Sequence, residues 1–347
     1  MKPTANSQQP AANSKTNLAV GSELSAVGSL HTPVLLNEML RAVAARDGEV
    51  ILDGTFGAGG YSRALLNSAK CRVIALDRDP AAQLLADALA REFTPGHFFF
   101  VAGRFSAMVE LLAAEGIHAV DAIVLDIGVS SMQFDDGARG FSFQHDAPLD
   151  MRMAQSGTSA ADIVNHYPEA ELTRILRDYG EERDAKRIAR ALVQRRAESP
   201  ITTTRQLADI IKNAVRGAGK MKIHPATRSF QALRIEVNQE LAELEAALIA
   251  AEQLLRPGGR LVVVTFHSLE DRIVKQFMLQ RSKEYAASFR HSPDALMPNA
   301  APQQMPFQLV TKNAITPTPE EVNRNPRARS AKLRCVLRTA TMNRHAA

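Results

Sequence analysis

The chain has 347 residues, 45% of them apolar, so it can form two domains with full cores. Two cysteines are too few for a zinc site or a disulfide scaffold, and no apolar run approaches the ~20 residues that span a bilayer. Lys and Arg exceed Asp and Glu by only 42 − 37 = 5, which by itself is weak support for a nucleic-acid partner.

The first 30 residues are rich in Ser, Ala, Asn and Gln and lack the apolar stretch of a signal peptide. We therefore expect residues 1–30 to be a disordered tail, residues 341–347 to be a short second tail, and the protein to be cytoplasmic.

The run from Val50 to Ser62 reads V-I-L-D-G-T-F-G-A-G-G-Y-S. It predicts a strand ending at Asp53, a glycine turn and the start of a helix. A second predicted strand, residues 72–77, ends at Asp77, 24 positions after Asp53. This layout holds an adenosine cofactor at the carboxyl edge of a parallel sheet, where the second acid can accept hydrogen bonds from ribose hydroxyls.

The glycine spacing indicates which cofactor binds. The order G-x-x-G-x-G-G breaks the dinucleotide fingerprint G-x-G-x-x-G, and the chain has no phosphate-binding G-x-x-x-x-G-K-[ST] loop. Asp53 precedes the turn, where it would repel a pyrophosphate and favour a cationic ligand. S-adenosylmethionine carries an ammonium and a sulfonium and no phosphate, so we expect it as cofactor; an ordinary glycine turn is the alternative.

Further strands are predicted at residues 97–102, 119–126, 260–266, 307–311 and 332–338, with helices at 80–92, 105–114 and 226–256 and from Leu269 onward. Between about residues 130 and 225 the pattern is helical and charged. The economical architecture is an α/β, Rossmann-like sheet domain (residues 31–130 and 226–340). A mainly helical substrate domain (residues 131–225) is inserted after the fourth strand.

Local signals add detail to the helices. Gln231, Arg234 and Asn238 share one face of the predicted helix 226–256 and form a candidate ligand edge, with an ordinary polar flank as the alternative. Thr204 is a candidate helix cap, and Ser268 with Asp271 resembles a capping box.

The loop after the fourth strand is the second candidate part of the site. Ligands of open parallel sheets bind beyond the carboxyl ends of the strands, which places Asp126 near the reacting group. Phe134, Phe141 and Phe143 lie among glycines and serines, where they could be ordered around a flat ring. The alternative is a structured loop whose phenylalanines only pack.

The basic residues are concentrated in two segments. Residues 174–234 contain 15 basic and 6 acidic residues, and residues 324–347 contain 7 basic and none acidic. This distribution suits a polyanionic partner, although each segment alone is also compatible with a solvated helical surface.

Many short motifs occur in the order found in one family, the bacterial small-subunit ribosomal RNA cytosine-N4 methyltransferases, which the chain resembles over about residues 31–340. The motifs are His31-Thr-Pro-Val-Leu-Leu, Asp53-Gly-Thr-Phe-Gly-Ala-Gly-Gly, Ala75-Leu-Asp-Arg-Asp-Pro, Gly103-Arg-Phe-Ser, Leu125-Asp-Ile-Gly-Val-Ser-Ser, Gly140-Phe-Ser-Phe, Leu149-Asp-Met-Arg-Met, Tyr179-Gly-Glu-Glu-Arg, His224-Pro-Ala-Thr-Arg-Ser-Phe-Gln-Ala-Leu-Arg-Ile, Phe266-His-Ser-Leu-Glu-Asp-Arg and Asn325-Pro-Arg-Ala-Arg-Ser.

The resemblance implies a class I methyltransferase fold, S-adenosylmethionine as methyl donor and a decoding-site cytosine of 16S RNA, at the ribosomal P site, as acceptor. It also implies the small ribosomal subunit as partner. No metal-binding residue is predicted from the sequence, which leaves metal dependence open. The cofactor contacts that it implies are Gly59, Gly60, Tyr61, Asp77, Phe105, Asp126 and Gln133. The chain departs from the family pattern at Tyr61, where members often have His.

For catalysis we expect Asp126 and the face of Gln231, Arg234 and Asn238 to frame the acceptor amine, with Asp126 and Asn238 as candidate catalytic groups. DNA amino-methyltransferases often carry a [DNS]-P-P-[YF] loop after the fourth strand, but this chain has Asp126-Ile-Gly-Val instead. The basic residues expected to contact RNA include Arg187 and Arg190.

Alternative functions stay open: an N-methyltransferase for another RNA base or a protein side chain, a non-enzymatic RNA-binding assembly factor and, more distantly, a nicotinamide dehydrogenase. The sequence leaves the oligomeric state open between monomer and homodimer.

Overall fold

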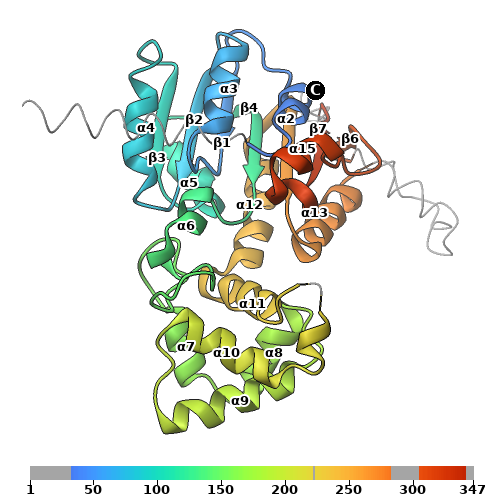
Figure 1. Ribbon diagram of the computed structural model, residues 1–347. Coiled ribbons are helices and arrows are strands. Elements are labelled where there is room, and N and C mark those ends of the chain that lie inside the picture. The colour runs from blue at the N-terminus through green and yellow to red at the C-terminus, as the bar shows by residue number, and fades with distance from the viewer. Residues whose placement is uncertain (1–32, 222, 283–304, 341–347) are drawn as a thin grey trace, which may run out of the picture.

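The computed structural model describes residues 33–221, 223–282 and 305–340, so both predicted tails lie outside the described residues (Figure 1). A seven-stranded sheet has the order β3-β2-β1-β4-β5-β7-β6. In that order the strands are β3 (Phe98–Ala102), β2 (Arg72–Asp77), β1 (Val50–Asp53), β4 (Val120–Asp126), β5 (Leu255–Thr265), β7 (Lys332–Arg338) and β6 (Phe307–Leu309). Strands β1 to β5 are parallel, and β7 runs antiparallel to both β5 and β6. This is the α/β, class I Rossmann-like sheet expected from the sequence.

The parallel strands are apolar on both faces because helices cover both faces of the sheet. Along β1, Ile51 packs into one core cluster and Leu52 into the other. Helices α2 (Leu36–Val43), α3 (Gly60–Ser68) and α4 (Ala82–Ala90) cover the face of Ile51. Helices α5 (Met108–Ala114), α12 (Glu240–Leu254) and α13 (Ser268–Gln280) cover the other. Successive strand residues therefore face opposite cores.

The chain between β4 and α12 forms a separate helical unit beyond the carboxyl edge of the sheet (Figure 1). Its elements are α6 (Ser131–Asp135), η2 (Gly137–Arg139), α7 (Ala160–His166), α8 (Glu169–Asp178), α9 (Ala185–Glu198), α10 (Thr204–Ala214), η3 (Ala218–Lys220) and α11 (Thr227–Asn238). This helical insert has its own core, which includes Phe230 and Leu233 of α11. Because α11 packs on the insert, we place the return to the sheet domain at Gln239 and not at residue 226. No helix in the described ranges is long and apolar enough to cross a membrane.

The prediction of a single helix over residues 226–256 is wrong. Helix α11 ends at Asn238 and α12 begins at Glu240, because Gln239 between them has a left-handed φ of 53°. Strand β5 then starts at Leu255, earlier than expected. Two expected caps are each displaced by one residue. Thr203 rather than Thr204 caps α10, and His267 with Glu270 forms the capping box of α13 in place of Ser268 with Asp271.

The C-terminal region adds two short elements beside the two antiparallel strands. Helix α15 (Pro319–Arg324) and the 3₁₀ turn η6 (Pro326–Ser330) precede β7, while the turn η1 (Phe105–Ala107) precedes α5. Leu35 donates its backbone N–H to Glu321 Oε1 at 2.7 Å. The C-terminal region and the start of the described chain therefore lie side by side.

Candidate functional site

A cavity of about 400 Å³ lies at the carboxyl ends of the parallel strands, where the strand order reverses between β1 and β4. The sheet domain supplies one wall, and α6 and α11 of the insert supply another. Of the expected site residues, the cavity is lined by Gly60, Tyr61, Asp77, Phe105, Asp126, Gln133, Gln231 and Arg234. The expected residues outside its lining are Gly59, Arg187, Arg190 and Asn238.

The glycine turn brings backbone to the wall of the cavity. Gly59 is the N-cap of α3 and has a left-handed φ of 78°, which favours glycine. A Cβ on Gly60 would lie 2.3 Å from Pro33 Cγ, and one on Gly59 would lie 2.8 Å from the Phe56 ring. These two positions therefore have no room for a side chain, and the turn can pack closely only with glycine.

Asp53 lies beneath the turn and does not line the cavity. Its carboxylate accepts hydrogen bonds from Ser62 Oγ at 2.7 Å and from the Thr55 N–H at 3.2 Å. Burial raises its pKa to about 6. Asp53 therefore holds the turn, and its charge raises the pKa of Asp126, which lines the cavity.

Asp77 lines the cavity and also supports its rim. Its two carboxylate oxygens accept the backbone N–H groups of Gly57 and Asp79, each at 2.8 Å. Burial raises the pKa of the carboxyl, while these two hydrogen bonds lower it. One side chain therefore ties the glycine turn to the loop that follows β2.

Asp126 ends β4 at the wall of the cavity, and its backbone N–H donates to Thr55 Oγ1 at 2.6 Å. Its Oδ1 is buried and has no hydrogen-bond partner in the described part of the chain. Burial raises the pKa of this carboxyl to about 8, and the charges of Asp53 and Glu270 add to the increase. An unpartnered buried carboxyl oxygen is costly unless a ligand supplies a donor.

Tyr61 and Gln133, two of the expected cofactor contacts, form hydrogen bonds to other residues of the protein through their polar side-chain atoms. The Tyr61 hydroxyl donates to the carbonyl of Val34, so this side chain holds the segment at Val34 beside the turn. The amide of Gln133 donates to Asp79 Oδ2 at 2.8 Å and accepts from the Ser130 N–H at 3.1 Å.

The opposite wall contains Gln231 and Arg234, as the shared helix face predicted. Arg234 Nε and Nη2 both donate to the Glu240 carboxylate at 2.8 Å, a bidentate ion pair. Asn238 is buried elsewhere on α11: its side chain accepts from the Met153 N–H at 2.9 Å and donates to the Met151 carbonyl at 2.7 Å. Because these bonds occupy its amide, Asn238 holds the chain that lines the cavity.

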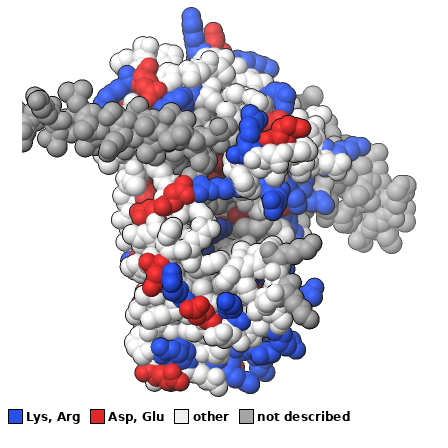
Figure 2. All heavy atoms as spheres, viewed as in Figure 1, with Lys and Arg blue, Asp and Glu red and all other residues white. Residues whose placement is uncertain are grey.

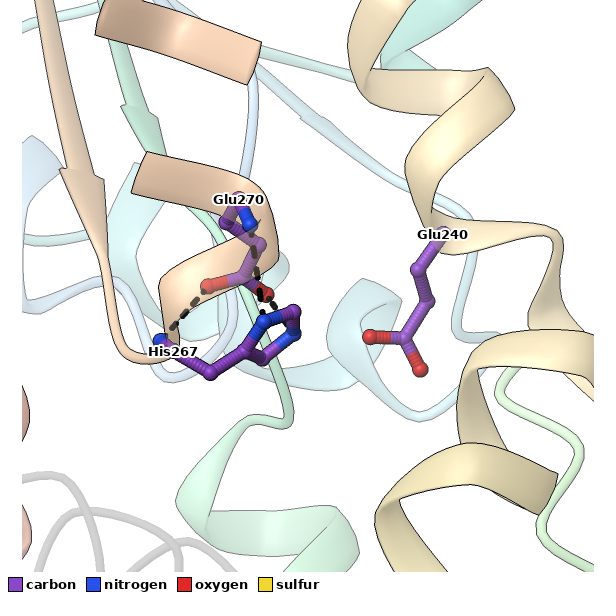
Figure 3. Close-up of side chains that lie close together, drawn as sticks. All are labelled: Glu240, His267 and Glu270. Atoms are coloured by element: carbon purple, nitrogen blue, oxygen red, sulfur yellow. Dashed lines mark hydrogen bonds and ion pairs between the residues drawn. The ribbon is translucent and has the colours of Figure 1, made fainter. Parts of the chain in front are cut away.

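Glu240, His267 and Glu270 lie close together beside this wall (Figure 3). His267 and Glu270 belong to one of the family motifs, but no role was expected for either, and Glu240 was not among the expected site residues. One side-chain ligand atom from each lies within 4.8 Å of the others, and His267 Nε2 is 2.8 Å from Glu270 Oε1. Both carboxylate oxygens of Glu240 already accept from the Arg234 guanidinium. The position of His267 directly after β5 was the available signal, whereas Glu240 reaches the site only through the break at Gln239.

Arg187 and Arg190 are exposed on α9, at the end of the insert away from the sheet (Figure 1). Arg190 Nε lies 3.9 Å from Glu169 Oε1. These arginines therefore belong to the outer surface of the insert and not to the cavity.

Comparison with known proteins identifies the family. Residues 28–339 match the MraW methylase family. The chain is 55% identical over 309 residues to "Ribosomal RNA small subunit methyltransferase H" of Rhodospirillum rubrum, covering 89% of this chain and 94% of the relative. It is 56% identical over 312 residues to the protein of the same name from Rhodospirillum centenum, covering 90% and 93%. The family expected from the motifs is confirmed: the chain belongs to the MraW methylase family and is a methyltransferase that uses S-adenosylmethionine.

Proposed function

We propose that this methyltransferase modifies the N4 amine of a decoding-site cytosine in the 16S RNA of the small ribosomal subunit. The names of its relatives support the ribosomal RNA substrate. The buried, unpartnered Oδ1 of Asp126 at the wall of the cavity is the observation on which the assignment to an amine acceptor depends. An amine supplies the N–H donor that this oxygen lacks.

The residues that line the cavity support a site for the cofactor. Gly60 and Tyr61 line the cavity, so the backbone at these two residues would contact the ligand, while Gly59 allows the turn to pack against Phe56. Asp77 would accept hydrogen bonds from the ribose hydroxyls, and Phe105 offers an apolar surface for the adenine ring. Asp126 and Gln133 complete the expected contacts. The amide of Gln133 is already hydrogen bonded, so it would act chiefly through packing.

The methyl donor supplies a methyl group on a sulfonium, which is a good leaving group. The protein must position a poor nucleophile, because the lone pair of the cytosine amine is delocalised into the ring. Asp126 would accept an amine N–H, localise electron density on nitrogen and stabilise the positive charge that develops. Beside a bound cation the pKa of its carboxyl falls from about 8, so Asp126 becomes an acceptor once the donor is in place.

The other wall would hold the acceptor base. Gln231 uses its Nε2 to donate to the Tyr179 carbonyl at 3.1 Å, which leaves its carbonyl oxygen for a ligand. Arg234 is fixed by Glu240, so its guanidinium is held in place at the cavity wall. Asn238 contributes by fixing the 151–153 segment and does not contact the base.

Basic side chains on both domains would bind the phosphate backbone. In Figure 2, Lys and Arg gather over the lower helical end of the molecule and around the C-terminal region, with acidic side chains between them. Arg327 lines the cavity and pairs with Asp135, so the C-terminal segment contributes one basic group to the cavity wall. Exposed arginines such as Arg187 and Arg190 would contact RNA further out.

The decisive experiment is mass analysis of nucleosides from small-subunit particles of cells with and without this protein, followed by methylation of the deficient particles in vitro. Loss and restoration of N4-methylcytidine at the decoding site supports the proposal. If a different methylated nucleoside or methylated protein is restored instead, the proposed cytosine acceptor is wrong. Particle binding without any methyl transfer indicates an assembly factor.

A further inference from the structure

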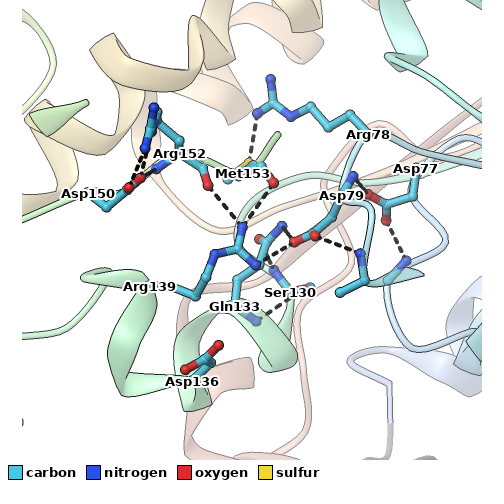
Figure 4. A network of polar contacts seen from close by, with 12 residues as sticks. Asp77, Arg78, Asp79, Ser130, Gln133, Asp136, Arg139, Asp150, Arg152 and Met153 are labelled. Atoms are coloured by element: carbon cyan, nitrogen blue, oxygen red, sulfur yellow. Dashed lines mark hydrogen bonds and ion pairs between the residues drawn. The ribbon is translucent and has the colours of Figure 1, made fainter. Parts of the chain in front are cut away.

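The loop after β2 connects the cofactor side of the cavity to the helical insert. Asp77, which faces the cavity, is followed by Arg78 and Asp79, and both of these side chains reach toward the insert (Figure 4). Within the insert, residues 151–153 precede α7, and the chain leaves the insert at Asn238, the last residue of α11. We call these two places the insert junctions.

Asp79 is 2% exposed and fully hydrogen bonded. Its Oδ2 accepts from Gln133 Nε2 at 2.8 Å and from Arg139 Nη1 at 3.0 Å, and its Oδ1 accepts from the Ala81 N–H at 3.0 Å. Its own N–H donates to Asp77 Oδ1. The carboxylate that faces the cavity therefore bonds directly to the residue that holds Arg139.

Arg139 links Asp79 to residues 151–153, the first insert junction. Its Nη2 donates to the carbonyls of Arg152 and Met153, both at 2.9 Å. An arginine can make these bonds and the ion pair with Asp79 at once because its guanidinium has five donors in a fixed plane. Met153 itself lines the cavity.

Arg78 contacts both insert junctions. Its Nη1 donates to the carbonyl of Asn238 at 3.0 Å, and its Nη2 lies 2.7 Å from Met153 Sδ. The Asn238 side chain in turn accepts from the Met153 N–H at 2.9 Å. Both junctions are therefore joined to each other and to consecutive residues of one loop.

We propose that Asp79 and Arg139 are positioning residues that couple binding of the cofactor at Asp77 to the placement of the insert, so that cofactor and RNA bind cooperatively. The proposal rests on the proposed function, in which Asp77 binds ribose and the insert binds RNA. A ligand that bonds to the Asp77 carboxylate restrains the group that orients Asp79. Asp79 and Arg139 form the hydrogen-bonded route from there to the backbone of residues 152 and 153, which precede α7.

The first test needs neither RNA nor turnover. Hydrogen exchange is followed at the Met153 amide, which bonds to Asn238, with and without S-adenosylhomocysteine in the full-length protein. We expect the ligand to slow this exchange by about fivefold or more in the wild type and in Arg152→Gln, but not in Arg139→Gln. Arg152→Gln is the matched control because its guanidinium pairs with Asp150 and does not reach Asp79. Equal protection in all three proteins would overturn the proposal, as would its absence from the wild type.

The second test measures the affinity for unmethylated small-subunit particles with and without S-adenosylhomocysteine. The wild-type ratio of the two affinities should fall in the range of about 5 to 150, and Arg139→Gln should bring it close to one. If the ratio for Arg139→Gln stays within about twofold of the wild-type ratio, Arg139 does not couple the two binding events and the proposal is contradicted. If Arg139→Gln does not fold, Arg139→Lys keeps the charge beside Asp79 but loses the planar fork, and an unchanged ratio there is equally decisive. Should the particles prove not to be the substrate, only this second test fails, so the two proposals are judged separately.

Discussion

Replacing Asp126 with Asn tests whether a buried carboxyl at the end of β4 is held neutral until a ligand arrives. In the folded protein its pKa is raised from 3.8 to about 8, chiefly by burial. Between these pH values the folded protein keeps a proton that the unfolded chain has released. The free energy of unfolding therefore falls as pH rises through this window, by at most ~1.4 kcal/mol per pH unit.

From pH 5 to pH 8 the upper limit is ~4 kcal/mol, the product of three pH units and ~1.4 kcal/mol. Asp126 lines the cavity and is only partly buried as a whole residue, so we expect about half of this, ~2 kcal/mol. Asn has a similar shape and does not titrate. The stability of Asp126→Asn relative to the wild type should therefore increase steadily from pH 5 to pH 8.

The assay is urea unfolding of both proteins without ligand at each pH, because the difference between them cancels the titration of all other groups. The same variant should lose methyl transfer by about 100-fold or more, since an amide is a weaker acceptor than a carboxylate. Asp121→Asn, at the other end of β4, should retain turnover. A stability difference that is constant across pH would show that Asp126 is ionised in the folded protein, and near-normal turnover would remove it from the reaction.

Three further predictions concern the cofactor, the turn and the RNA. Asp77→Asn should weaken binding of S-adenosylhomocysteine in calorimetry by about tenfold, because it removes a charged acceptor for ribose; unchanged affinity would exclude that role. Gly60→Ala places a Cβ 2.3 Å from Pro33 and should lower the free energy of unfolding by about 1–3 kcal/mol, whereas an unaltered melting temperature would mean that the turn adjusts. Charge reversal at Arg187, Arg190 and Arg195 should weaken RNA binding and lower the salt slope by about 0.7 for each lost phosphate contact; an identical slope would assign these arginines to a solvated surface.

The sequence was sufficient to predict features that depend on local patterns. The structure contains the strands, the glycine turn and the terminal acids predicted at residues 50–62 and 72–77. They could be predicted because hydrophobic runs and glycine turns determine the conformation of only a few neighbouring residues. It also predicted that Asp77 and Asp126 would lie at one edge, since the carboxyl ends of parallel strands meet there. Gln231 and Arg234 reached the cavity together because helical spacing fixes their shared face.

Tertiary structure decided what the same side chains do there. Asp53 is beneath the turn and Asn238 is bonded to the 151–153 segment, although the sequence pattern gave both residues ligand-facing positions. Glu240 approaches Arg234 only because the chain reverses its backbone conformation at Gln239, a residue type without a strong preference for that conformation. Hydrogen-bond partners far apart in sequence are chosen by packing, so local pattern could place a residue at the site but could not decide whether its polar atoms remain free for a ligand.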